Sequence, residues 1–237
     1  MTAILSNLQA VHSAIAQAAQ LARRDAASIT LLAVSKTMSA ELVREACGAG
    51  QRAFGENYLQ EALDKMQALH DLPLEWHFIG PIQSNKTRAI AENFSWVHSV
   101  DRLKVAERLS AQRPPELPLL NVCLQVNVSG EDSKAGVAPQ HALEQARAIA
   151  ALPRLRLRGL MSIPAPADTV QAQRVPHAML RELLLQMNLP RDGKPGLGLD
   201  TLSMGMSHDL TAAILEGATI VRVGTAIFGK RNYGETK

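Results

Sequence analysis

The chain has 237 residues, of which 46% are hydrophobic and 20% charged, with a formal net charge of +3 at pH 7. This composition is typical of a globular protein and excludes a disordered or fibrous one. The small net charge and the aromatic content of 3% argue against nucleic-acid binding, which favours basic patches and stacking rings. No stretch approaches the roughly 20 apolar residues that span a membrane. We therefore expect neither nucleic acid nor membrane among its partners.

The N-terminal segment is predicted to be an amphipathic helix that packs on the domain. Its apolar residues Ile4, Leu8, Val11 and Ile15 follow helical spacing, and no positive region precedes them as it would in a leader peptide. The two cysteines of the chain do not make a disulfide framework. We expect a cytoplasmic protein.

Strand and helix patterns alternate along the rest of the chain. Apolar runs predict strands at residues 29–35, 53–55, 75–79, 96–98, 119–127, 155–161, 201–203 and 220–223. Helical spacing predicts helices near residues 39–49, 57–69, 84–92, 101–111, 139–151, 170–187 and 207–216. Strands that alternate with helices pair in parallel through right-handed crossovers. We expect one α/β domain over residues 1–237, a single (β/α)8 barrel of the TIM type with an extra N-terminal helix; an open doubly wound sheet is the alternative.

One predicted strand departs from the pattern of a buried parallel sheet. Arg156 and Arg158 alternate with leucines in the strand at 155–161, whereas such strands are usually apolar on both faces. The arginines either lie at the polar N-terminal end of the barrel or pair with carboxylates.

Residues with useful chemistry gather where the predicted strands end. Active sites of (β/α)8 barrels lie at the C-terminal ends of the strands. The residues found there are Lys36, Glu56, Asn57, His77, Asn127, Met161, Ser162, Ser203 and Arg222. Both ends of the chain would thus contribute to one pocket.

Lys36 is the candidate nucleophile. It follows an apolar strand and precedes a predicted helix start at Ser39. Partial burial favours the neutral amine, which attacks an aldehyde to form a Schiff base. The alternative is an ordinary solvated lysine at a strand end.

Two turns near the far end of the sequence are candidates for holding an anion. The segment Ser-Met-Gly-Met-Ser at 203–207 precedes a predicted helix, and Gly224 and Thr225 follow the last strand. Backbone N–H groups at such places bind phosphate, and Gly205 allows close approach. Each turn alone could instead be a helix cap with nothing bound. A lysine nucleophile with a phosphate cradle points to pyridoxal 5′-phosphate.

Arg222 lies two residues before Gly224, so the two residues face the same pocket mouth. If the ligand is pyridoxal phosphate, an arginine at the ring nitrogen keeps that nitrogen unprotonated, because a guanidinium does not release its proton. The cofactor is then a poor electron sink, which disfavours carbanion chemistry. The alternative is a structural ion pair with Glu216 or Asp200.

The remaining candidates are weaker. His77 lies between apolar residues and is expected to be a hydrogen-bonded core histidine rather than a base. Met161, Met204 and Met206 either line a ligand ring or fill gaps in the core. The histidines and cysteines show no metal-ligand spacing, so no metal site is expected.

Several sequence blocks occur in an order typical of a known family. They are AVSK at 33–36, FGENY at 54–58, WHFIGPIQSNK at 76–86, NVSGEDSKAG at 127–136, RGLM at 158–161, LSMGMS at 202–207 and VGTAIFG at 223–229. In these blocks the chain resembles the pyridoxal phosphate homeostasis protein family, whose fold is similar to the N-terminal barrel of alanine racemase. Together they cover nearly the whole chain. One departure is the segment at 37–39, which lacks the proline frequently seen there.

The resemblance implies a bound pyridoxal phosphate, linked covalently as an aldimine to Lys36. It places Arg222 at the pyridine nitrogen and Asn57 near the ring. It also implies phosphate contacts from Ser203, Gly224 and Thr225. The full set of expected cofactor-binding residues is Lys36, Asn57, Met161, Ser203, Gly205, Met206, Arg222, Gly224 and Thr225.

The resemblance also implies a protein that binds, buffers and delivers pyridoxal phosphate, and so maintains intracellular vitamin B6 and the linked amino and keto acids. Apo forms of pyridoxal phosphate enzymes would be transient recipients. Alanine racemases similar to this barrel add a C-terminal domain with a tyrosine base, whereas the tyrosines here are Tyr58 and Tyr233. We expect a monomeric carrier with no catalytic residue. Lys86 and Lys134 would handle a second cofactor in transit.

Two other classes of function stay open. One is a small fold-type III enzyme such as an amino-acid racemase or a decarboxylase, with Lys36 as base and His77 or Tyr58 as the second acid–base group. The other is a Schiff-base aldolase or phosphosugar isomerase, with Glu56 beside Lys36. The aldolase needs no bound chromophore, whereas both readings with pyridoxal phosphate do.

Overall fold

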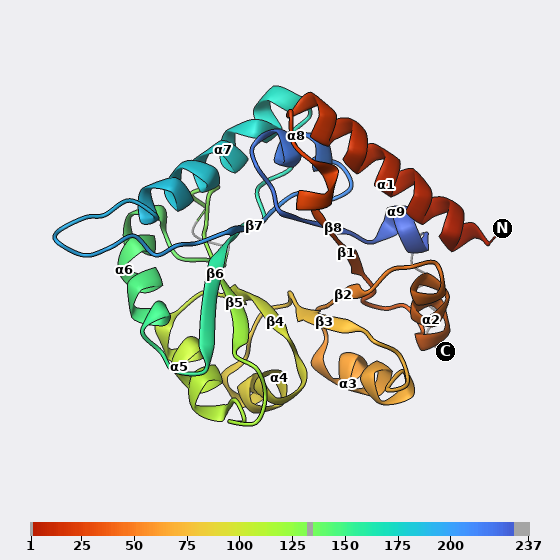
Figure 1. The fold of residues 1–237 in the computed structure, drawn as a ribbon, viewed down its shortest axis with the longest axis horizontal. Coiled ribbons are helices and arrows are strands. Elements are labelled where there is room, and N and C mark those ends of the chain that lie inside the picture. The colour runs from red at the N-terminus through yellow and green to blue at the C-terminus, as the bar shows by residue number, and fades with distance from the viewer. Residues whose placement is uncertain (1, 132–134, 230–237) are drawn as a thin grey trace.

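A computed structural model describes residues 2–131 and 135–229 and shows a ring of strands with helices around its outside (Figure 1). The strands are β1 (Thr30–Val34), β2 (Ala53–Glu56), β3 (Glu75–Phe78), β4 (Trp96–Val100), β5 (Leu120–Gln125), β6 (Leu155–Met161), β7 (Thr201–Ser203) and β8 (Ile220–Val223). Each strand pairs in parallel with the next, and β8 pairs with β1 to close the barrel. The predicted (β/α)8 barrel is confirmed, and the open sheet is excluded.

The helices follow the strands in the predicted order. They are α1 (Ala3–Leu21), α2 (Ala40–Gly48), α3 (Leu59–Ala68), α4 (Thr87–Asn93), α5 (Leu103–Gln112), α6 (Pro139–Ala150), α7 (Val170–Met187), α8 (Leu210–Leu215) and α9 (Thr225–Phe228), with 3-10 turns η1 (Ala26–Ser28) and η2 (Ser84–Lys86). The helix expected at 207–216 begins later, at Leu210. The short α9 was not predicted. No helix in the described part of the chain is both long and apolar enough to cross a membrane.

The main core lies between the barrel and its helices. The predicted apolar face of α1 is buried through Ile4, Leu8, Val11 and Ile15. Burying a side chain of this size stabilises the fold by roughly 1.5–3 kcal/mol. In Figure 1, α1 runs past α8 and α9 on the side where β8 meets β1. The extra helix therefore covers the closure of the barrel.

A smaller apolar cluster lies apart from this main core. It consists of Leu32, Ala53, Trp96, Cys123, Met161 and Ile220, which come from six different strands. Towards the N-terminal ends of the strands, Arg158 pairs with Asp200, with 2.7 Å between Nη2 and Oδ2. The Arg158 guanidinium also stacks 5.0 Å from the centroid of the Trp96 ring. Pairing with a carboxylate thus explains Arg158, whereas Arg156 is exposed to solvent.

Candidate functional site

A cavity of about 280 Å³ lies at the C-terminal ends of the strands, beside β1 and β8. It is lined by Val34, Lys36, Asn57, Ile79, Ile163, Met206, Ser207, His208, Arg222, Gly224 and Thr225. Ser207, His208 and Thr225 are exposed, so the cavity opens to solvent. Six of the nine residues expected from the sequence meet here: Lys36, Asn57, Met206, Arg222, Gly224 and Thr225.

Lys36 stands just past the end of β1. Ser35 still pairs with β2, because its N–H donates to the Gly55 carbonyl at 3.0 Å. The chain then turns toward α2, and the Lys36 side chain is half-buried at the cavity wall. This places an amine where the strand ends, as the sequence predicted.

Arg222 supplies a buried positive charge to the same cavity. Its side chain is only 4% exposed. Nη1 donates to Ser203 Oγ at 2.9 Å and Nη2 to the Ser162 carbonyl at 2.8 Å. Burial lowers the pKa of Arg222 to about 10, so the guanidinium stays protonated at neutral pH. Since it has five N–H donors, it keeps capacity for a ligand acceptor.

The alternative of a structural ion pair for Arg222 is not what the structure shows. Glu216 pairs instead with Arg174 and Arg181. Asp200 pairs with Arg158. Both carboxylates that the sequence offered to Arg222 therefore belong to other arginines.

A chain of hydrogen bonds runs from Arg222 through the barrel to β3. The Ser203 hydroxyl group, which accepts from Arg222, lies 2.7 Å from His98 Nδ1. His98 Nε2 lies 2.9 Å from His77 Nδ1, and His77 Nε2 lies 2.7 Å from Glu75 Oε1. The expectation that His77 is a hydrogen-bonded core histidine is confirmed.

The two ends of this chain fix the direction of its hydrogen bonds. A guanidinium can only donate and an ionised carboxylate can only accept. The hydrogen bond from His77 lowers the pKa of Glu75, and burial lowers the pKa of His98 well below 6.5, so the carboxyl is ionised and the imidazole neutral. Burial also lowers the pKa of His77, so in this arrangement the Ser203 hydroxyl proton is directed to His98.

The loop after β7 is held from below by a buried carboxylate. Asp209 Oδ1 accepts a hydrogen bond from the Met206 N–H at 2.6 Å, and its Oδ2 accepts one from His177 Nε2 at 3.0 Å. Gly205 has a φ of +90°, and a Cβ atom there would lie 2.4 Å from Ala213 Cβ. This glycine lets the loop pack on α8 and so places Met206 at the cavity.

Three expected residues do not line the cavity. Met161 is fully buried in the cluster with Trp96 and Cys123. Ser203 is turned toward Arg222 and His98. Gly205 is buried in the loop that packs on α8. Two of them adjoin lining residues, since Ser203 accepts a hydrogen bond from Arg222 and Gly205 directly precedes Met206.

Two buried polar atoms near the cavity have no hydrogen-bond partner among the described residues. They are Asn57 Oδ1 and Ser162 Oγ. An unsatisfied buried polar group costs about 1–3 kcal/mol. Asn57 lines the cavity, so a ligand hydroxyl group would satisfy its oxygen. The donor set of amine, guanidinium and backbone turn suits a ligand that has an aldehyde, an acceptor and a phosphate.

Sequence reasoning missed two groups around this site. His98 was discounted for lack of metal-ligand spacing, yet it connects Ser203 to His77. Lys65 was not among the candidates, yet its Nζ is buried and lies 2.8 Å from Glu56 Oε1. Burial raises the pKa of Glu56. A buried glutamate is normally paired with a cation. The position of Glu56 at the end of a buried strand could therefore have indicated a nearby lysine such as Lys65.

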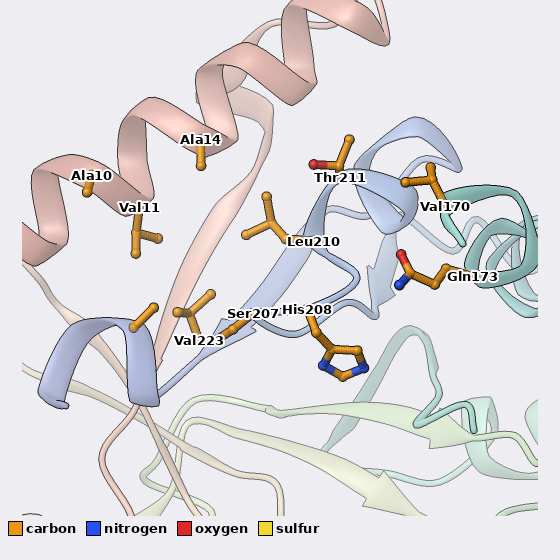
Figure 2. A pocket seen from close by; sticks show the side chains of 11 residues that line it. Ala10, Val11, Ala14, Val170, Gln173, Ser207, His208, Leu210, Thr211 and Val223 are labelled. Carbon is orange, nitrogen blue, oxygen red and sulfur yellow. The ribbon is translucent and has the colours of Figure 1, made fainter. Parts of the chain in front are cut away.

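Figure 2 shows a neighbouring cavity of about 350 Å³ between α1, α7, α8 and α9. Ala10, Val11 and Ala14 of α1 face Leu210 and Thr211 of α8 across it. It shares Ser207 and His208 with the first cavity but is lined by no lysine or arginine. An anionic ligand is therefore better matched by the cavity at Lys36.

Of the two lysines expected to handle a second ligand, the one that the structure describes lies outside the site. Lys86 is exposed at the end of η2 and does not line the cavity. Lys134 lies outside the described residues. No group of three residues able to hold a metal ion occurs within 2–131 and 135–229.

Comparison with known proteins identifies the family. A family model described as "Alanine racemase, N-terminal domain" matches residues 6–232. The pyridoxal phosphate homeostasis protein of Pseudomonas aeruginosa is 64% identical over 234 residues, which are 99% of this chain and 98% of that protein. This chain belongs to the pyridoxal phosphate homeostasis protein family. The family member of Escherichia coli K12 is 50% identical over 238 residues, covering 99% of this chain and 100% of its own. The resemblance seen in the sequence is confirmed.

Solved structures agree with this family assignment. PipY of Synechococcus elongatus, solved with pyridoxal phosphate bound, has a TM-score of 0.77 and 40% identity, covering 91% of this chain and 100% of PipY. The alanine racemase of Corynebacterium glutamicum has a TM-score of 0.69 at 20% identity, and this chain covers 61% of it. The second likeness shows the shared barrel alone.

Proposed function

We propose that this protein binds pyridoxal phosphate in the cavity at Lys36, and that it buffers and delivers the cofactor instead of using it for catalysis. One observation carries the proposal: an amine, a buried guanidinium and a Gly-Thr turn, from opposite ends of the chain, converge on one cavity. The names of the family members and the bound cofactor in PipY support it.

Each lining residue has a part in this proposal. Lys36 would hold the cofactor covalently through its amine, which condenses with an aldehyde with loss of water. Arg222 would donate to the ring nitrogen, and Asn57 and Met206 would lie beside the ring. The N–H groups of Gly224 and Thr225, at the start of α9 where helical partners are absent, bind the phosphate. When bound, the cofactor supplies an aldehyde carbon that links reversibly to amines.

Two features favour a carrier over a catalyst. Arg222 has a pKa of about 10, so it donates at neutral pH and leaves the ring nitrogen unprotonated, which weakens the electron sink. The cavity also opens to solvent past Ser207 and Thr225. Water weakens the electrostatic preorganisation that a racemase or decarboxylase needs, and the same opening allows release to an apo-enzyme.

We further propose that residues 1–237 act as one monomeric unit in the cytoplasm. Cys47 and Cys123 are both buried and neither forms a disulfide in the described part of the chain, which suits a reducing compartment.

The first test is the absorbance spectrum of the purified protein with added pyridoxal phosphate, followed by borohydride reduction and peptide mass mapping. We expect a visible band and a pyridoxyl mass on the Lys36 peptide. Both should be lost in Lys36→Ala and kept in Lys104→Ala, which removes an exposed lysine of α5. A protein that stays apo and is colourless after excess cofactor has been removed would overturn the proposal and favour the aldolase reading.

The second test separates carrier from enzyme. The loaded protein is incubated with each amino acid, and racemisation and decarboxylation are measured. We expect no turnover above that of free pyridoxal phosphate. His208 is the imidazole that lines the cavity, Tyr58 is exposed and outside the lining, and Tyr233 lies outside the described residues. Turnover that disappears in His208→Gln would establish an enzyme instead.

We also propose that Lys86, with Lys134, handles a second cofactor molecule during transfer. Lys86 is exposed in the segment after β3, where it can meet a ligand outside the cavity. The test is the rate of cofactor transfer to an apo-enzyme by a Lys86→Ala, Lys134→Ala double variant. We expect slower transfer, and an unchanged rate would end this part of the proposal.

A further inference from the structure

The turn that presents Lys36 has a strained backbone. The Met38 N–H donates to the Ser35 carbonyl at 3.0 Å and so closes a four-residue turn around Lys36 and Thr37. Thr37 has a φ of +64°, in the left-handed region. A β-branched residue is disfavoured there, because its Cβ substituents crowd the backbone. Such a turn persists only where its surroundings hold it.

A buried lysine behind the turn provides that hold. Lys65 of α3 is 5% exposed. Its Nζ donates to the Ser35 carbonyl at 2.7 Å, to Glu56 Oε1 at 2.8 Å and to Glu61 Oε1 at 2.5 Å. An ammonium group has three donors, so all three are used. We call Lys65, Glu56 and Glu61 the Lys65 cluster.

The Lys65 cluster forms hydrogen bonds with both sequence neighbours of Lys36. On one side, the Ser35 hydroxyl donates to Glu56 Oε1 at 2.6 Å. On the other, the Thr37 N–H donates to Glu61 Oε1 at 2.6 Å. The backbone before and after Lys36 is thereby tied to β2 and α3 by charged groups, which form stronger hydrogen bonds than neutral ones.

We propose that Lys65 and Glu61 are positioning residues that aim the Lys36 amine at the aldehyde carbon of the cofactor. The inference rests on the proposed function, because it concerns the covalent step at Lys36. Neither residue lines the cavity, so neither contacts the ligand. Both act through the backbone of the turn.

This arrangement predicts that the Lys65 cluster matters only for ligands that react with the amine. Pyridoxal phosphate has the aldehyde, whereas pyridoxine 5′-phosphate has an alcohol in its place and cannot form the link. A misplaced Lys36 amine therefore lowers the affinity for pyridoxal phosphate and leaves the affinity for pyridoxine 5′-phosphate unchanged. A collapsed site would weaken both.

The test uses Glu61→Ala, which cuts the Thr37 tie at a side chain that is 30% exposed, and Lys65→Met, which removes the centre of the cluster. Asp64→Ala is the matched control, because Asp64 is an exposed acid of the same helix that accepts from Gln60. Three quantities are measured: the affinity for each ligand, the rate at which borohydride traps cofactor on the Lys36 peptide, and the thermal midpoint of the apo-protein.

We expect Glu61→Ala to slow trapping and weaken pyridoxal phosphate binding by on the order of tenfold to a hundredfold, as for a small misplacement of a reacting group. Its affinity for pyridoxine phosphate should equal that of wild type, and Asp64→Ala should match wild type throughout. Wild-type trapping in Glu61→Ala would overturn the inference, as would equal loss of both ligands. Glu61→Ala alone decides if Lys65→Met does not fold.

Failure of the underlying function would look different. If wild-type protein binds no pyridoxal phosphate, or if its link forms on a lysine other than Lys36, the proposed function fails. If wild type links through Lys36 and the cluster variants do so equally well, only the positioning role fails.

Discussion

Replacing Asn57 with leucine should stabilise the apo-protein and lower its affinity for the ligand. Asn57 Oδ1 is buried and has no partner among the described residues, and such an atom costs about 1–3 kcal/mol. Asn57→Leu removes this cost at similar volume. Allowing for imperfect packing, we expect a gain of about 1–2 kcal/mol, which raises the melting temperature by roughly 2–8 °C for a chain of this size.

The same substitution should lower the affinity for pyridoxal phosphate. A neutral hydrogen bond is worth about 0.5–1.5 kcal/mol, so its loss weakens binding roughly twofold to tenfold. The assays are thermal unfolding of the apo forms and a titration followed by absorbance. Stability and affinity should therefore move in opposite directions, which is the mark of a residue kept for a ligand.

Asn188→Leu is the control for this reasoning. Both amide atoms of Asn188 are satisfied, because Oδ1 accepts from the Leu199 N–H at 2.7 Å and Nδ2 donates to the Leu199 carbonyl at 2.8 Å. This variant should lose stability and keep its affinity. The argument is refuted if Asn57→Leu melts below wild type as Asn188→Leu does, or if it binds the cofactor as tightly as wild type.

Three further predictions concern stability and reactivity. Burial lowers the pKa of His98 and His77 below 6.5, so their contribution to the free energy of unfolding is complete above pH 6.5. It is lost on acidification, by at most about 1.4 kcal/mol per pH unit for each histidine. A urea midpoint that does not fall between pH 7 and 5.5 would contradict this, and the control His70→Gln, at an exposed histidine, should keep the same pH dependence. Burial raises the pKa of Cys123 from 9.0 to about 12, so a thiol reagent at pH 8 should label it about a thousandfold more slowly than an ordinary thiol, and fast labelling without denaturant would show an accessible thiolate. Gly205→Ala should lower both the melting temperature and the cofactor affinity, since the new Cβ would meet Ala213 at 2.4 Å.

The sequence predicted the barrel because two periodicities alternate along it, and it predicted the cavity because barrel topology gathers strand ends. Lys36 and Arg222 could be paired across the chain for that reason alone. The direction of each side chain was harder to predict. The Ser203 side chain accepts a hydrogen bond from Arg222 inside the barrel, and the short strand β7 gave too little pattern to predict that contact. Its contact with the phosphate stays a prediction.

The groups behind the site depend on contacts between elements, which a single sequence does not display. His98 is one residue in a fully buried strand, and nothing local indicates that it meets His77. Lys65 was more accessible to reasoning. It lies three residues after buried Ala62 and four before buried Leu69, on the inner face of α3, where a lysine requires an acid.

The cavity straddles the junction at which the barrel closes. Lys36 follows the first strand and Arg222 belongs to the last, and these two strands pair directly. During synthesis, a chain whose β8 has not yet been made has the Lys36 amine but neither the Arg222 guanidinium nor the turn at Gly224. Under the proposed function, the cofactor can be captured only by a finished chain, and once captured it ties the first strand to the last. A bound cofactor then indicates that β1 and β8 are paired, and a chain in which these strands separate releases the cofactor.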